Sequence, residues 1–291
     1  MMRSMTGYGR RQLTEDGREM TVEVKTVNHR FLDAALRLPR HLGFAEEAMR
    51  KQLADALRRG HADVFVTYRN TRSDARRVSC DAALAGAYRD AMAALSDATG
   101  ARNDMPLWQY AQLPDVLTVT ENEEDQQAVW ALLSRTLAEA LAQVDEMRLR
   151  EGEALRQDLT EHLKLLEEMR QQILQRAPGV VRDYRDRLLQ RIAELGVTAP
   201  DDQRILQEVA LFADHAAIDE ELSRLDSHIR QAYALMAGEA ECGSKLNFLV
   251  QEMNREVNTI GSKALDSEIA KLVVDAKSEI EKLREQIQNV E

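Results

Sequence analysis

The alternation of hydrophobic and polar residues near the start of the chain predicts a small sheet. Residues 21–27 (TVEVKTV) place valines on one face and Glu23 and Lys25 on the other, which is typical of a half-buried strand. Two further strands, at residues 34–38 and 63–68, and a helix at residues 44–57 complete this segment. We therefore expect an antiparallel sheet with a helix packed on one face, an α+β unit.

From residue 81 onward the pattern becomes helical. Helices are predicted at residues 81–99 and 108–113. Apolar residues then recur every three or four positions from Val129 to Ile173, which predicts one helix of about 50 residues, roughly 75 Å long. Pro178 and the glycine after it are expected to end this helix. A helix of this length usually packs against other subunits or bridges domains.

The last third of the chain predicts a helical hairpin followed by a third helix. Apolar spacing marks helices from Ile205 to Met236, from Leu246 to Ile260 and from Ile269 to Val290. The segment between the first two is short, so they should lie antiparallel. The last helix has a regular three-to-four repeat, which suits a bundle or a subunit contact. Together with the long helix, it carries more apolar surface than one chain is expected to cover, which predicts a homo-oligomer.

These elements suggest an α+β fold in three parts: an N-terminal antiparallel sheet with a packed helix, long helices, and a C-terminal hairpin or bundle. The predicted domains are residues 1–125, a helical connector at 126–200, and residues 201–291. With 4% aromatic and 31% charged residues, the composition is typical of long helices. No apolar run reaches the ~20 residues that span a bilayer, and the two cysteines are far apart. A membrane protein and a disulfide scaffold are excluded, and a cytoplasmic protein is expected.

Charge is distributed unevenly and points to a polyanion as partner. The net charge is −11, yet residues 1–79 contain 16 Lys and Arg against 10 Asp and Glu. A basic local field can attract phosphate even in an acidic protein. Cations for phosphate and rings for unstacked bases are what RNA recognition uses. The candidate RNA-binding residues are Arg3, Tyr8, Arg10, Asn28, His29, Arg30, Arg58 and Arg59. The simpler alternative for each is a turn or a helix end.

The C-terminal hairpin predicts a cluster of acidic and histidine side chains. Ala240 is the middle of the connecting segment, so residues equally far from it should lie at the same height. His228 and Glu252 are each twelve residues away, and Arg224 and Glu256 are each sixteen away. These residues flank the apolar seams of the two helices in the same way, so they should face one another. The expected cluster is Glu221, Arg224, His228, Glu252 and Glu256.

Three carboxylates and one imidazole could hold a divalent ion, and oxygen-rich ligands favour Mn²⁺ or Mg²⁺ over Zn²⁺. Such an ion could activate water for phosphodiester hydrolysis. The alternative is a surface ion-pair network, which amphipathic helices often carry. If cleavage did not need a metal, His29 and His61 would remain as general acid and base. His41, His162 and His215 are expected to be surface or packing residues.

Several sequence blocks also carry a family resemblance. They are residues 5–9 (MTGYG), 23–33 (EVKTVNHRFLD), 148–152 (RLREG), 220–228 (EELSRLDSH), 251–263 (QEMNREVNTIGSK) and 284–289 (REQIQN). Over nearly its whole length the chain resembles the YicC/YloC-type family of bacterial stress-associated endoribonucleases.

The resemblance implies an endoribonuclease that depends on Mn²⁺ or Mg²⁺ and assembles as a hexameric ring around RNA. It supports Glu221, His228, Glu252 and Glu256 as metal ligands. Glu208 and Glu220 are weaker candidates for the metal site. Arg224 and Arg255 would then contact the scissile phosphate.

Two departures from the family pattern bear on activity. Asn247 and Ala217 stand where the family usually has Asp. With two fewer carboxylates, a non-catalytic oligomeric RNA-binding or adaptor protein remains the alternative.

Overall fold

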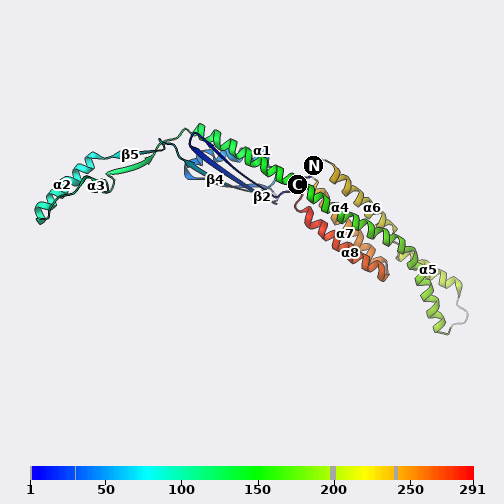
Figure 1. Ribbon diagram of the computed structural model, residues 1–291. Helices are drawn as coiled ribbons and strands as arrows, with labels where there is room; N and C mark the ends of the chain where they lie inside the picture. Colours follow the sequence, from blue (N-terminus) through cyan, green and yellow to red (C-terminus); the bar gives the residue numbers. More distant parts are fainter. Residues whose placement is uncertain (1, 30, 197–200, 239–241) are drawn as a thin grey trace.

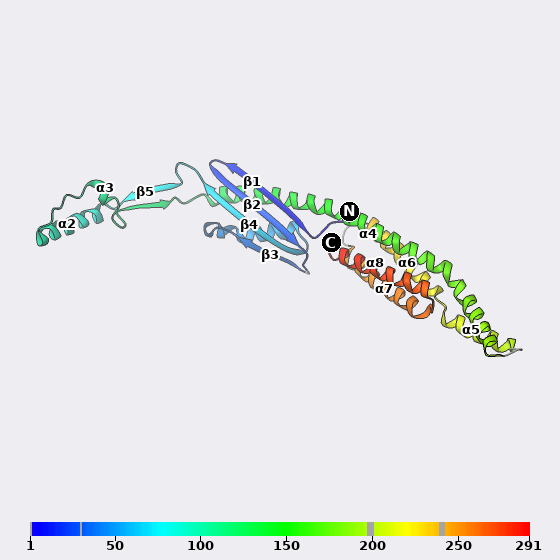
Figure 2. The same cartoon turned by 60° about the horizontal axis from the view of Figure 1, so that its bottom comes forward.

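The computed structural model describes residues 2–29, 31–196, 201–238 and 242–291. The molecule is elongated, with a sheet near the middle, a projecting arm at one end and a group of helices at the other (Figures 1 and 2). The two ends of the chain meet between the sheet and the helices, where Ser4 and Val290 form a β-bridge. The predicted α+β class is confirmed.

A four-stranded mixed sheet forms the N-terminal part. Its strands are β1 (Gly7–Glu15), β2 (Arg18–Val27), β3 (Leu32–Arg37) and β4 (Gly60–Asn70), in the order β1-β2-β4-β3. The pairs β1–β2 and β2–β4 are antiparallel as expected, but β3 runs parallel to β4. The 3₁₀ helix η1 (Arg40–Ala45) and helix α1 (Glu46–Ala56) lie between these two strands in sequence. They carry the chain back to the starting end of β3, which is the crossover that parallel strands require.

Among the described residues, helices cover one face of this sheet. Helix α1 and the first part of α4 (Gln126–Glu194) pack on it. The buried side chains there include Met20, Val22, Val24, Val64, Met49, Leu53, Leu133 and Leu137. Strand β1 approaches α4 very closely, because a Cβ on Gly9 would lie 2.1 Å from the carbonyl oxygen of Ala140. The opposite face of the sheet is open to solvent.

Helix α4 is a single helix of 69 residues that connects the sheet with the C-terminal helices. The expectation that it ends at Pro178 is therefore wrong. A proline inside a helix removes a hydrogen bond and costs about 3 kcal/mol. Arg176 helps to offset this cost, because it pairs with Asp183 beyond the proline at 2.6 Å and with Asp266 at 2.8 Å. Burial of Ile173 and Val180 on either side stabilises the helix further.

Residues 76–121 form the projecting arm. It consists of the antiparallel pair β5 (Arg76–Cys80) and β6 (Leu117–Glu121), with α2 (Ala82–Thr99) and α3 (Leu107–Tyr110) between them. Neither helix has a buried residue. The exposed apolar side chains include Val78, Leu95, Leu107, Trp108 and Val119. A two-stranded ribbon of this kind is only marginally stable by itself.

The C-terminal part consists of α5 (Asp202–His215), α6 (Asp219–Ala237), α7 (Gly243–Lys263) and α8 (Ser267–Ile287). One helix was expected from Ile205 to Met236, but the chain breaks between α5 and α6. Three acidic residues, Asp219 to Glu221, form the first turn of α6, where they favour a helix start.

The apolar repeat of α8 is buried inside the chain, against α7 and the second part of α4. The expectation that this repeat leaves uncovered apolar surface is therefore wrong. Within the ranges described, no helix is both long and apolar enough to span a membrane.

Candidate functional site

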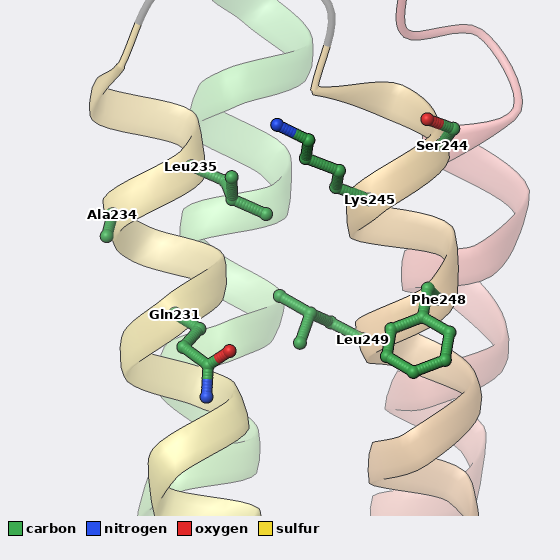
Figure 3. Close-up of a pocket in the computed structure, with 7 residues that line it drawn as sticks. All are labelled: Gln231, Ala234, Leu235, Ser244, Lys245, Phe248 and Leu249. Atoms are coloured by element: carbon green, nitrogen blue, oxygen red, sulfur yellow. The ribbon is translucent and has the colours of Figure 1, made fainter.

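The hairpin of α6 and α7 brings part of the predicted cluster together. The two helices lie side by side (Figure 3). Arg224 Nη1 lies 3.9 Å from Glu256 Oε1, so the pairing predicted from equal distance to the connecting segment is present. Arg224 also donates a hydrogen bond to Glu220, one turn earlier on α6. The connecting residues 239–241, including the expected midpoint Ala240, lie outside the described residues.

Two carboxylates of this cluster are buried: Glu221 is 6% exposed and Glu256 is 5% exposed. Lys263 Nζ donates a hydrogen bond of 2.7 Å to Glu221 Oε1. Burial alone would raise the pKa of Glu221, but the hydrogen bonds and the charges of Lys263 and Arg224 outweigh it, so the pKa is lowered. The carboxylate is therefore ionised and already has cationic neighbours.

Some polar atoms of this cluster, which lies along the α6–α7 edge, have no hydrogen-bond partner in the described part of the chain. Glu221 Oε2 and His228 Nδ1 are buried and have no hydrogen-bond partner among the described residues. The two residues are seven positions apart on α6 and so share a face. Buried polar atoms without partners are often satisfied by water or an ion. On α7, Glu252 is half-buried, and it too forms no ion pair or hydrogen bond within the described chain.

The carboxylate oxygens and the imidazole nitrogen are therefore of the kinds that bind a divalent cation, but their present arrangement is an ion-pair network. Within the described ranges, no three His, Cys, Asp or Glu side chains lie close enough together to hold a metal ion. The positive charge beside the buried carboxylates comes from Lys263, which pairs with Glu221, and from Arg224, which pairs with Glu256. Arg255 is exposed on α7. Glu208 lies on α5, where it accepts a hydrogen bond from Tyr184, and is not part of the cluster.

A pocket lies between the last turns of α6 and the first turns of α7 (Figure 3). Its lining is mainly apolar and includes Leu235, Leu249 and the exposed ring of Phe248, with Lys245 as its one charged residue. Among the described residues that line it there is no carboxylate or histidine, so these residues offer no ligand of the predicted kind.

The open face of the sheet carries aromatic rings among cations. Lys25 Nζ lies 5.9 Å from the ring centres of both Tyr8 and Phe65. The guanidinium of Arg37 lies 4.7 Å from the ring centre of Phe65. Exposed rings on a sheet, flanked by cations, are the arrangement on which single-stranded nucleic acids stack their bases.

The predicted RNA-binding residues fall into two groups. Tyr8 and Arg10 lie on the open face, with Asn28 and His29 just beyond the end of β2. Arg3 and Arg58 instead line a pocket between α1 and α4. Arg59 follows α1, and Arg30 lies outside the described residues.

Three residues of the open face were missed: Lys25, Phe65 and Arg37. The polar side of the predicted strand at residues 21–27 contained the signal for Lys25, but the neighbours of each strand were not known from the sequence.

The comparisons with known proteins identify the family. Residues 2–157 match the family described as "Endoribonuclease YicC-like, N-terminal region", and residues 173–291 match "Endoribonuclease YicC-like, C-terminal". The chain belongs to the YicC-like family.

Two curated relatives extend this match. A protein named "Probable endoribonuclease YicC" from Clostridioides difficile (strain 630) is 38% identical over 290 residues, 99% of each chain. A protein of the same name from Haemophilus influenzae (strain ATCC 51907 / DSM 11121 / KW20 / Rd) is 30% identical over 291 residues, all of both chains. The N-terminal match ends within α4 and the C-terminal match begins within it, so both regions of the YicC-like family include part of this helix.

Asn247 and Ala217, where the resemblance leads us to expect aspartate, lie in different segments of the C-terminal part. Asn247 lines a polar groove between α7 and α8, together with Gln251 and Asn254. It is nine residues before Glu256, which is about half a turn away around the helix. Ala217 lies in the break between α5 and α6. Asn247 therefore removes no carboxylate from the face of α7 that carries Glu256.

Proposed function

We propose that the protein is an endoribonuclease that binds RNA on the open face of the sheet and cleaves its backbone at the α6–α7 edge. The main support is the match to relatives named probable endoribonuclease over essentially the whole chain. The rings of Tyr8 and Phe65, with Lys25 between them, give the open face a means of holding unstacked bases.

Glu221, His228, Glu252 and Glu256 would hold Mn²⁺ or Mg²⁺ at the cleavage site. When bound, the ion supplies an activated water and a charge that stabilises the phosphoryl oxygens. Binding requires Lys263 and Arg224 to release the carboxylates that they now neutralise. Lys263 is 40% exposed and can turn to solvent. The two guanidinium groups of Arg224 and Arg255 would then be available for the scissile phosphate.

A cleavage assay with Glu252→Gln tests this proposal. End-labelled RNA is incubated with Mn²⁺, with Mg²⁺ or with EDTA, and the products are examined for linear phosphate ends. We expect the metal-dependent hydrolysis to fall by about 100-fold or more in Glu252→Gln, because a ligand is lost. RNA affinity should stay unchanged.

Glu168→Gln is the matched control, because Glu168 is an exposed carboxylate on α4, outside the predicted cluster. Equal hydrolysis by Glu252→Gln and Glu168→Gln would contradict the site. RNA binding without hydrolysis under either ion would favour the non-catalytic adaptor instead. That alternative is supported by the ion pairs that already neutralise the charges of Glu221 and Glu256.

We also propose that the protein is a homo-oligomer, with six subunits suggested by the family resemblance. The projecting arm supports this proposal, because its two helices bury no side chain within the chain. Helices of this kind gain most of their stability from packing an apolar face. Every copy of the chain carries the same arm, so a second copy can supply that packing.

A further inference from the structure

Two histidines that are far apart in sequence meet at one end of the open sheet face. The pairing of β2 with β4 places Val27 opposite His61, and His29 follows two residues after Val27. The ring centres of His29 and His61 are 6.4 Å apart, with an angle of 69° between the ring planes. Both rings remain accessible, since His29 is exposed and the His61 side chain is 28% exposed.

Hydrogen bonds hold both rings in defined orientations. Asp33 is paired with His61 across β3 and β4, and its Oδ2 lies 2.8 Å from His61 Nδ1. The Asp63 carboxylate lies 3.7 Å from His61 Nε2, beyond hydrogen-bond distance. A protonated His61 therefore has two carboxylates as counter-ions, and its Nε2–H is left to donate elsewhere.

His29 is held in a complementary way. Its Nδ1 lies 3.0 Å from the backbone carbonyl oxygen of Phe31. A carbonyl can only accept a hydrogen bond, so Nδ1 carries the hydrogen. In the neutral ring, Nε2 then keeps its lone pair and can accept a proton.

We propose that His29 and His61 form a second RNA-cleaving site, which acts by transesterification and needs no metal. His29 Nε2 takes the proton of a ribose 2′-hydroxyl, whose oxygen forms a bond to the adjacent phosphorus. The bond from phosphorus to the 5′ oxygen breaks, and His61 Nε2–H donates its proton to that oxygen. The products are a 2′,3′-cyclic phosphate and a 5′-hydroxyl, and proton exchange with water restores both rings.

The surroundings suit a single RNA strand. His61 and Phe65 point to the same face of β4, four residues and therefore about 13 Å apart. A base stacked on Phe65 would place the backbone a few nucleotides along at the histidine pair. Arg59, two residues before His61, has a buried Nε with no hydrogen-bond partner among the described residues, which suits a phosphate. The inference rests on the proposed RNA binding at the open face, not on the metal site.

The test is cleavage in excess EDTA of a short single-stranded RNA of mixed sequence. The purified chain should leave 2′,3′-cyclic phosphate ends, and His61→Ala and His29→Ala should each lower this rate by about 100-fold or more. The same RNA carrying 2′-O-methyl groups should not be cut in EDTA, because the attacking hydroxyl is blocked. Hydrolysis at the α6–α7 edge uses water, so in Mn²⁺ the methylated RNA should still be cut.

His215→Ala is the matched control, because His215 is an exposed histidine in the last turn of α5, remote from the sheet. Prepared in the same way, it should keep the full rate in EDTA, whereas a contaminating nuclease would give the same rate in all three histidine variants. Circular dichroism of each variant shows whether the sheet is still folded. No cleavage in EDTA, an equal rate in all variants, or cleavage of the methylated RNA in EDTA would each overturn the proposal. Loss of Mn²⁺-dependent hydrolysis alone would count against the α6–α7 site and leave this one standing.

Discussion

At the scale of single residues, the helical part depends on buried acids that are matched by cations. Glu279, on α8, accepts hydrogen bonds of 2.7 Å from both His162 and Lys282. Asp266 caps the start of α8 and pairs with Arg176. Burial alone would raise the pKa of each acid, but hydrogen bonds and nearby positive charge outweigh it and lower the pKa, as for Glu221. These acids stabilise the fold only while they are ionised.

A pH dependence of stability follows from these groups. A carboxyl whose pKa is lower in the folded than in the unfolded chain contributes its full stability above the unfolded value. That contribution is lost as the pH falls through the folded value. We expect the melting temperature to fall between about pH 6 and about pH 3. Glu279→Gln should show a smaller fall, because glutamine does not titrate.

The exposed Glu285→Gln, also on α8, serves as the control and should follow the unmodified chain. Thermal unfolding followed by circular dichroism measures all three proteins. A melting temperature that rises on acidification would contradict the ion-pair account.

At the scale of elements, the strands and helices with regular patterns could be predicted. Residues 21–27 alternate strictly and lie in β2, and Asp81 caps α2 by accepting a hydrogen bond from the backbone of Leu84. Strand β1 was not predicted, because it is an edge strand with Arg10 and Arg11 in succession, so neither of its faces is consistently apolar. In β5 every residue is exposed, so burial leaves no alternation in its sequence.

The candidate site was predictable to a similar extent. Arg224 and Glu256 could be paired because a hairpin has simple symmetry. Lys263, which neutralises Glu221, could not be foreseen, because the contact depends on how far a long side chain reaches from the last turn of α7. The meeting of His29 and His61 depends on which strands are neighbours, and alternation within one strand does not contain that information.

The close approach of β1 to α4 gives a prediction at the same scale. In Gly9→Ala the added methyl would lie 2.1 Å from the carbonyl oxygen of Ala140, which belongs to helix backbone and cannot turn away. We expect the free energy of unfolding to fall by about 1–3 kcal/mol, as for other overpacked sites. Urea unfolding measures the change.

Gly86→Ala is the matched control for this substitution. A Cβ on Gly86, inside α2, would meet no atom within 4 Å. Alanine is a better helix former than glycine by about 1 kcal/mol, so this variant should be as stable as the unmodified chain or more so. Equal effects of the two substitutions would show that the contact with α4 is not what limits position 9.

At the scale of the whole molecule, the arm is the part that most needs a partner. The backbone N–H of Asn122 donates a hydrogen bond of 3.0 Å to the carbonyl oxygen of Ala75, so the two ends of the arm lie next to each other. Glu124 anchors this base to the sheet by accepting hydrogen bonds from Tyr68 and Asn70. The arm can therefore be removed without opening the sheet.

Replacing residues 76–121 with a short Gly-Ser linker tests the role of the arm in assembly. We expect the shortened chain to keep its helical signal in circular dichroism, because both cores lie outside the arm. Its mass by light scattering should fall below that of the full-length assembly. An unchanged number of subunits would show that other surfaces hold the copies together.

Because α4 is one continuous helix, the insertions and deletions that it can accept are restricted. Over 69 residues the helix extends about 100 Å, and each residue turns it by about 100°. Removing one residue between Val144 and Leu155 would rotate the C-terminal helices about the axis relative to the sheet. The chain ends, held to Arg148 through the backbone of Ser4 and the carboxylate of Glu291, would then lose their register. Insertions and deletions should therefore accumulate in the loops, and this helix should accept them only in lengths that restore its phase, such as seven or eleven residues.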